Sequence, residues 1–252
     1  PPGLTPLPRV AWETYLLPQF EQKALYDRYD FTVNWGQGTN RALVATRLSV
    51  FLCPSTPNPE RTDGVPEENP WVPFAAATDY SAITHVEPRL AATGLVDFAG
   101  SGIMPKNEKP RLADVTDGLS NTILLAESAG RPYVYRRGQK AGDLPNVRNN
   151  GGGWCRPASE YALDGSSSDG RAFPGPCAVN CTNGEDIGSQ SFPLPAPYGS
   201  NGTGETYAFH PGGANVGLGD GSVRLVQQNV DIRVFAQLVT RDRGEVVNLD
   251  GK

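Results

Sequence analysis

This sequence of 252 residues contains two histidines, and the imidazole side chain is the one that ordinarily acts as a base near neutral pH. They are His85 and His210, and nucleophilic catalysis would need one of them beside an activated serine or cysteine. The sequence has no G-x-S-x-G elbow, and its Gly-Ser pairs are typical of turns. We interpret His210 as a hydrogen-bonded residue that ties one hairpin strand to its neighbours, and we predict that the chain is not an enzyme.

Four cysteines could form disulfides or bind a metal. Cys177 and Cys181 are so close in sequence that a bridge between them would hold their loop in place. Cys53 and Cys155 stand alone; a bridge between them is an open alternative, because a sequence does not fix disulfide pairing. Zinc would need further ligands at comparable spacing, and the two histidines are equally isolated, so no zinc site is predicted. Four cysteines in a loop-rich chain favour an oxidising compartment.

The segment LDGSSSDGR, residues 163–171, places two carboxylates on a glycine-containing loop. Asp164 and Asp169, with serines between them, offer the oxygen ligands that a hard cation such as calcium prefers. The segment lacks EF-hand spacing, and the alternative is a turn in which the Asp side chains bond to nearby backbone amides. Calcium at Asp164 and Asp169 is the single metal prediction, and no other cofactor is predicted.

Three tryptophans lie beside glycine or proline in loop-like segments. Trp35, Trp71 and Trp154 could stack on sugars or on a partner, or they could fill the core beneath long loops. Stacking would make the chain an extracellular carbohydrate- or ligand-binding module, with calcium as an optional component.

The composition argues against several protein classes. A net charge of -5, from 22 basic and 27 acidic residues, argues against a phosphate-binding surface and hence against nucleic acid as a partner. No run approaches the ~18 apolar residues of a membrane span. Glycine and proline together make up about a fifth of the chain, which indicates a loop-rich protein and not a helical bundle.

The first half of the chain predicts short elements. Residues 10–30 predict two short helices, because Pro18 lacks an amide hydrogen and interrupts the helical pattern. Residues 40–52 predict a helix that turns into a strand, and the proline-rich residues 54–73 predict a surface loop. DYSAITHV, residues 79–86, predicts a strand.

The second half predicts a more regular sheet. NTILLAES, residues 121–128, predicts a compact buried strand. Residues 206–210 and 214–226 predict an antiparallel hairpin, with Asp220-Gly221 as a tight turn.

The remaining segments complete an α+β fold. VDIRVFAQLVTRD predicts a short amphipathic helix that Asn229 or Asp231 would cap. Residues 141–205 show little periodicity and are too long for an ordinary connection. We predict one domain over residues 1–252, with this segment as a long excursion.

Several sequence blocks occur in the order found in one bacterial family. The last block is FHPGGANVGLGDGSVRLV, in which His210 is followed by nine residues and then by Asp220-Gly221. The blocks before it are LLPQFEQKALYD, FLCPST, DYSAITHV, TDGLSNTILLAES, and DGSSSDG with PGPCAVNCTN. On these blocks, which run from the first residue to about residue 240, the chain resembles the prepilin-like family of unknown function that is expanded in planctomycete bacteria.

The resemblance implies a pilin-like globular head with an antiparallel sheet, short helices and long loops. Family members begin with a prepilin-type cleavage site and a hydrophobic stalk helix of the type IV pilin or type II secretion pseudopilin kind. This chain starts at PPG, so the resemblance implies that the N-terminal stalk helix is absent from it. One sheet face would then show apolar side chains to water, partly covered by residues 10–30, and residues 141–205 would face outward.

The resemblance also implies a structural or interaction role without enzymatic activity. The chain would be the extracellular head of a pilin-like or pseudopilin-like surface or secretion-system protein. Its partners would be other pilin-like subunits or surface components, and only the stalk helix would contact the membrane. No catalytic residue can be carried over; His210, Asp220 and Gly221 carry over as signature residues without an assigned role. The extracellular carbohydrate- or ligand-binding module is the alternative function.

Overall fold

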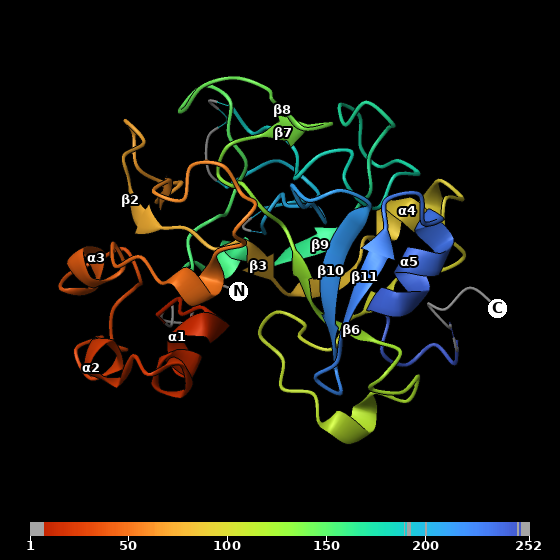
Figure 1. Cartoon of the computed structure of the whole chain (residues 1–252), viewed down its shortest axis with the longest axis horizontal. Coiled ribbons are helices and arrows are strands. Elements are labelled where there is room, and N and C mark those ends of the chain that lie inside the picture. The colour runs from red at the N-terminus through yellow and green to blue at the C-terminus, as the bar shows by residue number, and fades with distance from the viewer. Residues whose placement is uncertain (1–7, 189, 191–192, 200, 246, 248–252) are drawn as a thin grey trace.

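The fold joins a helical N-terminal segment to β-sheets formed by the rest of the chain (Figure 1). The computed structural model describes residues 8–188, 190, 193–199, 201–245 and 247. Short helices and mostly antiparallel sheets occur together, which confirms the α+β prediction. Across these residues, no helix combines the length and the apolar character needed to span a bilayer.

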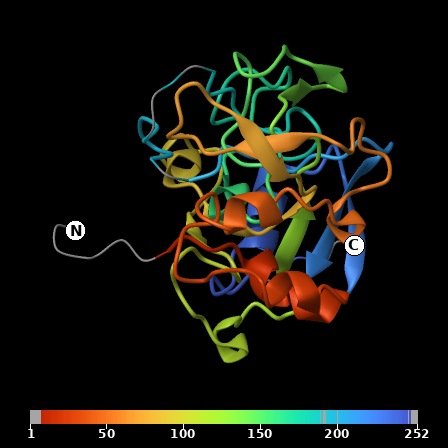
Figure 2. The same ribbon diagram turned by 90° about the vertical axis from the view of Figure 1, so that its left-hand side faces the viewer.

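Pro18 divides the first helical segment as predicted. α1 (Trp12–Leu16) ends before it, the 3-10 helix η1 (Leu17–Phe20) contains it, and α2 (Lys23–Tyr26) follows. Helices this short are unstable in isolation, so tertiary packing must hold them. Seen from their own side of the molecule, they lie in front of the strands (Figure 2).

The strand predicted within residues 40–52 does not form. This segment folds as α3 (Asn40–Leu43) and the 3-10 helix η2 (Ser49–Phe51). The ring of Phe51 stacks on Trp154, with ring centroids 6.1 Å apart, and its carbonyl accepts a hydrogen bond from the Asp79 amide at 2.8 Å. These long-range contacts override the local preference for extended backbone.

The proline-rich segment 54–73 returns to the interior midway, so it is a surface loop only in part. β1 (Thr62–Gly64) pairs antiparallel with β2 (Pro73–Ala76), and the Asp63 side chain is buried there.

Four antiparallel strands form the central sheet, in the order β11-β10-β6-β3. Their bounds are β3 (Tyr80–Ser81), β6 (Ile123–Glu127), β10 (Gly213–Leu218) and β11 (Val223–Gln227). β6 is the predicted buried strand, and β10 and β11 form a hairpin over the predicted turn. Gly221 in that turn has φ of 86°, a conformation that glycine adopts without strain.

Residues 206–210 do not join this hairpin, contrary to prediction. They run beside other segments through isolated parallel bridges, from Thr206 to Val179 and from Tyr207 to Ser128.

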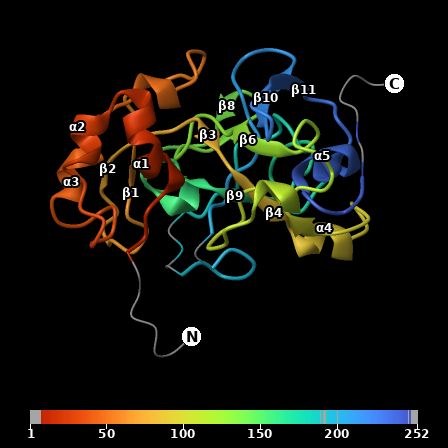
Figure 3. The same ribbon diagram turned by 90° about the horizontal axis from the view of Figure 1, so that it is seen from below.

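A smaller sheet, β5-β4-β9, lies beneath the central one (Figure 3). β4 (Ile83–Val86) pairs antiparallel with β5 (Gly100–Ser101) and parallel with β9 (Tyr161–Leu163). The predicted strand 79–86 is therefore divided at Ala82 between two sheets.

Two helices flank these layers. α4 (Pro88–Ala92) follows β4, and α5 (Ile232–Val239) is the predicted amphipathic helix. Asp231 caps α5, because its Oδ1 accepts a hydrogen bond from the Arg233 amide at 2.7 Å. The remaining elements are η3 (Leu112–Asp114), β7 (Tyr135–Arg136), β8 (Gln139–Lys140) and η4 (Pro157–Ser159).

Buried apolar side chains gather in two clusters. The larger lies between the two sheets and α5, and it includes Ile83, Val216 and Phe235. The other joins the N-terminal helices to the excursion, with Leu17 and Trp154 among its members.

The excursion 141–205 is not the outward-facing loop that was expected. Trp154 and Tyr161 are almost wholly buried, and β9 extends the smaller sheet. Strand pairing is absent at Asn183. Its side chain instead makes three hydrogen bonds, of 2.8 to 2.9 Å, to backbone groups within residues 129–135. Because such bonds satisfy the backbone without secondary structure, a segment without periodicity can still be buried.

The outer face of the central sheet points away from β4 and β9 (Figure 3). It carries exposed apolar side chains and is open to solvent there. Leu125, Gly217 and Val223 form one cross-strand row on it, and Leu225 lies in the next row. Val223 is 70% exposed and Leu225 is 49% exposed. Residues 10–30 do not cover these side chains, since their buried residues pack in the cluster around Trp154.

Candidate functional site

His210 is held against a buried carboxylate at one end of the open sheet face. Glu127 ends β6, and its Oε2 lies 2.8 Å from His210 Nε2. The Asn215 amide, on the neighbouring strand β10, donates to the same oxygen at 2.6 Å, and Asn215 Nδ2 lies 3.2 Å from His210 Nε2. His210 is hydrogen-bonded, although its segment is not the predicted hairpin strand, and it ties that segment to the sheet through a partner 83 residues away in sequence.

Cys53 reaches the same place from the N-terminal side of the molecule. Its Sγ, a carboxylate oxygen of Glu127 and a ring nitrogen of His210 all lie within 4.8 Å of one another. The Cys53 amide donates to Asp79 Oδ2 at 2.9 Å, and Asp79 is paired with Arg61 in the interior. This buried ion pair fixes the backbone from which the thiol projects.

The Asp220-Gly221 half of the signature has a separate, local role. Asp220 Oδ1 accepts hydrogen bonds from the Ser222 amide at 2.9 Å and from Ser222 Oγ at 2.7 Å. These bonds lower the pKa of Asp220 and close the hairpin turn. The turn joins β10 to β11, whereas the pairing of β10 with β6 is what brings Asn215 to Glu127.

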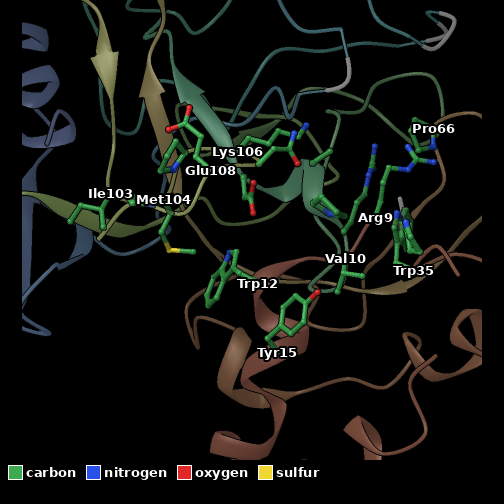
Figure 4. A pocket seen from close by; sticks show the side chains of 18 residues that line it. Arg9, Val10, Trp12, Tyr15, Trp35, Pro66, Ile103, Met104, Lys106 and Glu108 are labelled. Atoms are coloured by element: carbon green, nitrogen blue, oxygen red, sulfur yellow. The ribbon is translucent and has the colours of Figure 1, made fainter. Parts of the chain in front are cut away.

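A cavity of about 690 Å³ lies between α1 and residues 103–110 (Figure 4). Trp12 and Tyr15 rise into it from α1, while Lys106 and Glu108 lie across from them. Aromatic side chains together with a few polar groups are typical of small-molecule sites.

Burial shifts the pKa values of two charged groups that line this cavity. It raises the pKa of Glu160 to about 7, although nearby Lys106 acts in the lowering direction. Burial also lowers the pKa of Lys106. Near neutral pH the Glu160 carboxyl can therefore either donate or accept a hydrogen bond. The Trp12 Nε1 donor is buried and has no hydrogen-bond partner within the described residues, so it could bond a ligand.

Comparison with known proteins places the chain in a family of unknown function. The family described as "Protein of unknown function (DUF1559)" matches residues 2–233. The chain belongs to the DUF1559 family. The matched region contains His210, Asp220-Gly221 and Cys53. No curated protein and no solved structure matches the chain.

The three tryptophans of this DUF1559 chain that were candidates for ligand stacking lie in different surroundings. Trp35 lines the cavity but is only 3% exposed, and its ring stacks on Phe74 with centroids 5.6 Å apart. Trp71 lies outside the cavity lining, with the Arg148 guanidinium 5.1 Å from its ring centroid.

Trp154 is a correction to the stacking prediction. It is wholly buried, and its Nε1 donates to the Thr46 carbonyl at 3.0 Å, so no ring face is free for a ligand. Trp12, which the sequence did not single out, lines the cavity instead. Its helical segment is rich in large apolar residues and predicts core packing, so no sequence signal distinguished it.

The two carboxylates of the predicted calcium loop bind different partners. Asp164 is buried and accepts hydrogen bonds from Arg89 Nε at 2.5 Å and Nη2 at 2.6 Å. Asp169 is exposed and accepts from Ser167 Oγ at 2.5 Å. The first is therefore neutralised by a guanidinium and the second closes a local turn, so the two do not converge on one cation.

The cysteines follow the predicted local pairing and not the distant one. Cys177 and Cys181 form a disulfide. Cys53 and Cys155 are free and both buried, so the alternative bridge between them does not form. Burial raises the pKa of the Cys155 thiol, which keeps that group protonated and chemically inert.

Proposed function

We propose that this chain is the non-enzymatic head of a pilin-like surface or secretion-system protein, exposed outside the cell. The open face of the central sheet carries this proposal. In a pilin-type subunit, the head packs an antiparallel sheet on a helix, and the chain has an antiparallel sheet with one face buried and one face open. The ordered sequence blocks, through their resemblance to the prepilin-like family, support the same role.

The shape of the open face suits a helix as occupant. Leu125 and Val223 stand on either side of Gly217, where an added Cβ would meet no atom closer than Leu125 Cβ at 3.9 Å. The absent side chain leaves a shallow depression between two apolar ridges. Apolar side chains exposed together on a sheet mark an interaction surface more often than chance exposure does.

The histidine geometry supports a non-enzymatic role. A catalytic triad uses the two ring nitrogens on opposite partners, one facing a carboxylate and the other a nucleophile. In this chain His210 Nε2 itself lies against the Glu127 carboxylate. His85 Nδ1 lies 2.9 Å from Thr84 Oγ1, and its Nε2 lies 3.6 Å from Glu87 Oε1. The Thr84 hydroxyl donates its hydrogen to the Tyr161 carbonyl at 3.1 Å, so its proton is not directed at the His85 ring.

The test is assembly in the cells that produce the protein. Asp at both Val223 and Leu225 should reduce incorporation into sheared surface filaments or secretion complexes at least tenfold, because a helix cannot bury two carboxylates. Leu112→Asp is the matched control, since Leu112 is 68% exposed but lies on η3, off the sheet. Incorporation of the double variant at the wild-type level would refute the proposal, as would a precursor with an ordinary secretory signal.

The cavity favours a second function, binding of a carbohydrate-type ligand. Trp12 and Tyr15 supply ring faces, and the Trp12 Nε1 donor and the Glu160 carboxyl supply polar contacts. A glycan array with the purified chain should identify a ligand, and calorimetry should show at least tenfold weaker binding for Tyr15→Ala. Trp71→Ala is the control, because Trp71 lies outside the cavity lining. Equal loss in both variants, or no ligand across a broad panel, would exclude this function.

A further inference from the structure

Three residues that are isolated in the sequence converge at the end of the open sheet face. Cys53 follows η2, Glu127 ends β6, and His210 precedes β10. Their ligand atoms, a thiol sulfur, a carboxylate oxygen and an imidazole nitrogen, all lie within 4.8 Å of one another. Among the described residues, this is the only group of three or more such side chains that meets this distance.

The surroundings hold each group in place from outside the cluster. The Cys53 amide is bonded to Asp79, and the Asn215 amide is bonded to Glu127 Oε2. Glu127 and Cys53 are buried, and burying a carboxylate beside a thiol and an imidazole is unfavourable unless charge compensates it. Partners that orient ligand side chains in this way are the usual outer layer of a protein metal site.

One side of the cluster is accessible from solvent. The His210 side chain is 24% exposed, and it borders a hollow of about 350 Å³ lined also by Tyr207, Phe209 and Asn180. An ion could enter from this side and keep one coordination position for water.

We propose that Cys53, Glu127 and His210 bind a divalent ion of the zinc class. A thiolate together with an imidazole selects a borderline-soft ion over calcium or magnesium, which prefer oxygen ligands alone. Zinc binds sulfur at about 2.3 Å and nitrogen or carboxylate oxygen at about 2.0–2.2 Å, so three ligands on one ion lie roughly 3.3–3.6 Å apart.

The His210–Glu127 separation needs a small adjustment to reach these values, and the Cys53 thiol starts within 4.8 Å of both ligand atoms. His210 Nε2 and Glu127 Oε2, now 2.8 Å apart, would move apart by roughly half an ångström as the ion replaces the hydrogen between them. The neutral ring then carries its proton on Nδ1, and the Cys53 thiol releases its proton to solvent. The site does not depend on the proposed head function, because neither the open apolar row nor the cavity of Trp12 takes part in it.

The experiment uses the purified chain, stripped with a chelator and titrated with zinc in a calorimeter and with cobalt in a spectrophotometer. We expect one ion per chain and a thiolate-to-cobalt charge-transfer band. Cys53→Ser and His210→Ala should each weaken zinc binding at least 100-fold, and Glu127→Gln should weaken it about 10- to 100-fold.

The chain supplies a matched control for each ligand type. Cys155→Ser removes the other free thiol and His85→Ala the other imidazole, and both variants should bind zinc as the wild type does. Circular dichroism checks that every variant is folded; if Cys53→Ser does not fold, the charge-transfer band of the wild type and the Glu127→Gln titration decide. Absence of stoichiometric zinc binding by the wild type, absence of the band, or equal weakening by the controls would overturn the proposal.

Discussion

Arg156 Nη1 donates to Asp63 Oδ2 at 2.7 Å, with both side chains almost completely buried. The bond joins the long excursion to β1, and Asp63 Oδ2 also accepts from the Gly153 amide at 3.2 Å. A segment without regular structure is thus held to strand β1 by one compensated pair of buried charges.

Removing one member of this pair should be strongly destabilising. Asp63→Ala leaves the Arg156 guanidinium buried without its counter-charge, so the free energy of unfolding should fall by about 3–5 kcal/mol. Urea denaturation followed by tryptophan fluorescence measures the change. Glu67→Gln is the control, because the Arg9–Glu67 pair has the same 2.7 Å separation but is largely exposed, and its loss should cost less than about 1 kcal/mol. Similar losses in the two variants would contradict the role assigned to burial.

Substitution by alanine should destabilise the protein at one glycine of β10 and have little effect at another. A Cβ at Gly213 would lie 1.9 Å from the Val226 carbonyl oxygen, whereas one at Gly217 would meet nothing closer than 3.9 Å. Gly213→Ala should therefore cost about 1–3 kcal/mol or more, and Gly217→Ala should change stability by less than about 1 kcal/mol. Thermal unfolding of the two variants checks this, and equal melting temperatures would show that the strand is placed wrongly.

Glu160 should make stability depend on pH. Its pKa in the folded chain is raised to about 7 from an ordinary value near 4.5, so the folded state holds this proton more tightly than the unfolded state does. The contribution of this group to the free energy of unfolding is therefore highest at acid pH, and it declines by about 3 kcal/mol as the pH rises from about 4.5 to about 7. Glu160→Gln should remove this decline.

Denaturation across that pH range measures the effect. Glu108→Gln, an exposed residue of the same cavity, should keep the wild-type pH profile. A profile of Glu160→Gln that matches the wild type would show that Glu160 titrates normally.

The cysteine pairing predicts a thiol count and a stability change. Unfolded in denaturant without reductant, the chain should react with two equivalents of a thiol reagent, at Cys53 and Cys155. Replacing Cys177 and Cys181 together by Ser should lower the free energy of unfolding by about 2 kcal/mol, the loop-closure value for so short a loop. Fewer than two reactive thiols would mean that Cys53 and Cys155 are bridged after all.

Local sequence chemistry predicted several elements correctly. Pro18 ends α1 because it lacks an amide hydrogen, whereas Asp220 closes the β10–β11 turn and Asp231 caps α5 through hydrogen bonds to residues two positions away. Such features follow from the backbone preferences of single residues, and distant parts of the chain do not change them.

Long-range packing decided everything that brings distant side chains together. The sequence could not show that Trp154 fills the core, that Arg89 neutralises Asp164, or that residues 206–210 leave the hairpin, because each outcome depends on a partner far along the chain.

The two candidate sites show the same division. The sequence by itself determined the family, the α+β class and His210 as a residue of interest. Only the tertiary structure brought Cys53 and Glu127 to His210 and opened a cavity beside Trp12. The physical reason is that residue type and spacing govern local backbone geometry, whereas a site is built where strands and loops from separate regions bury their side chains against one another.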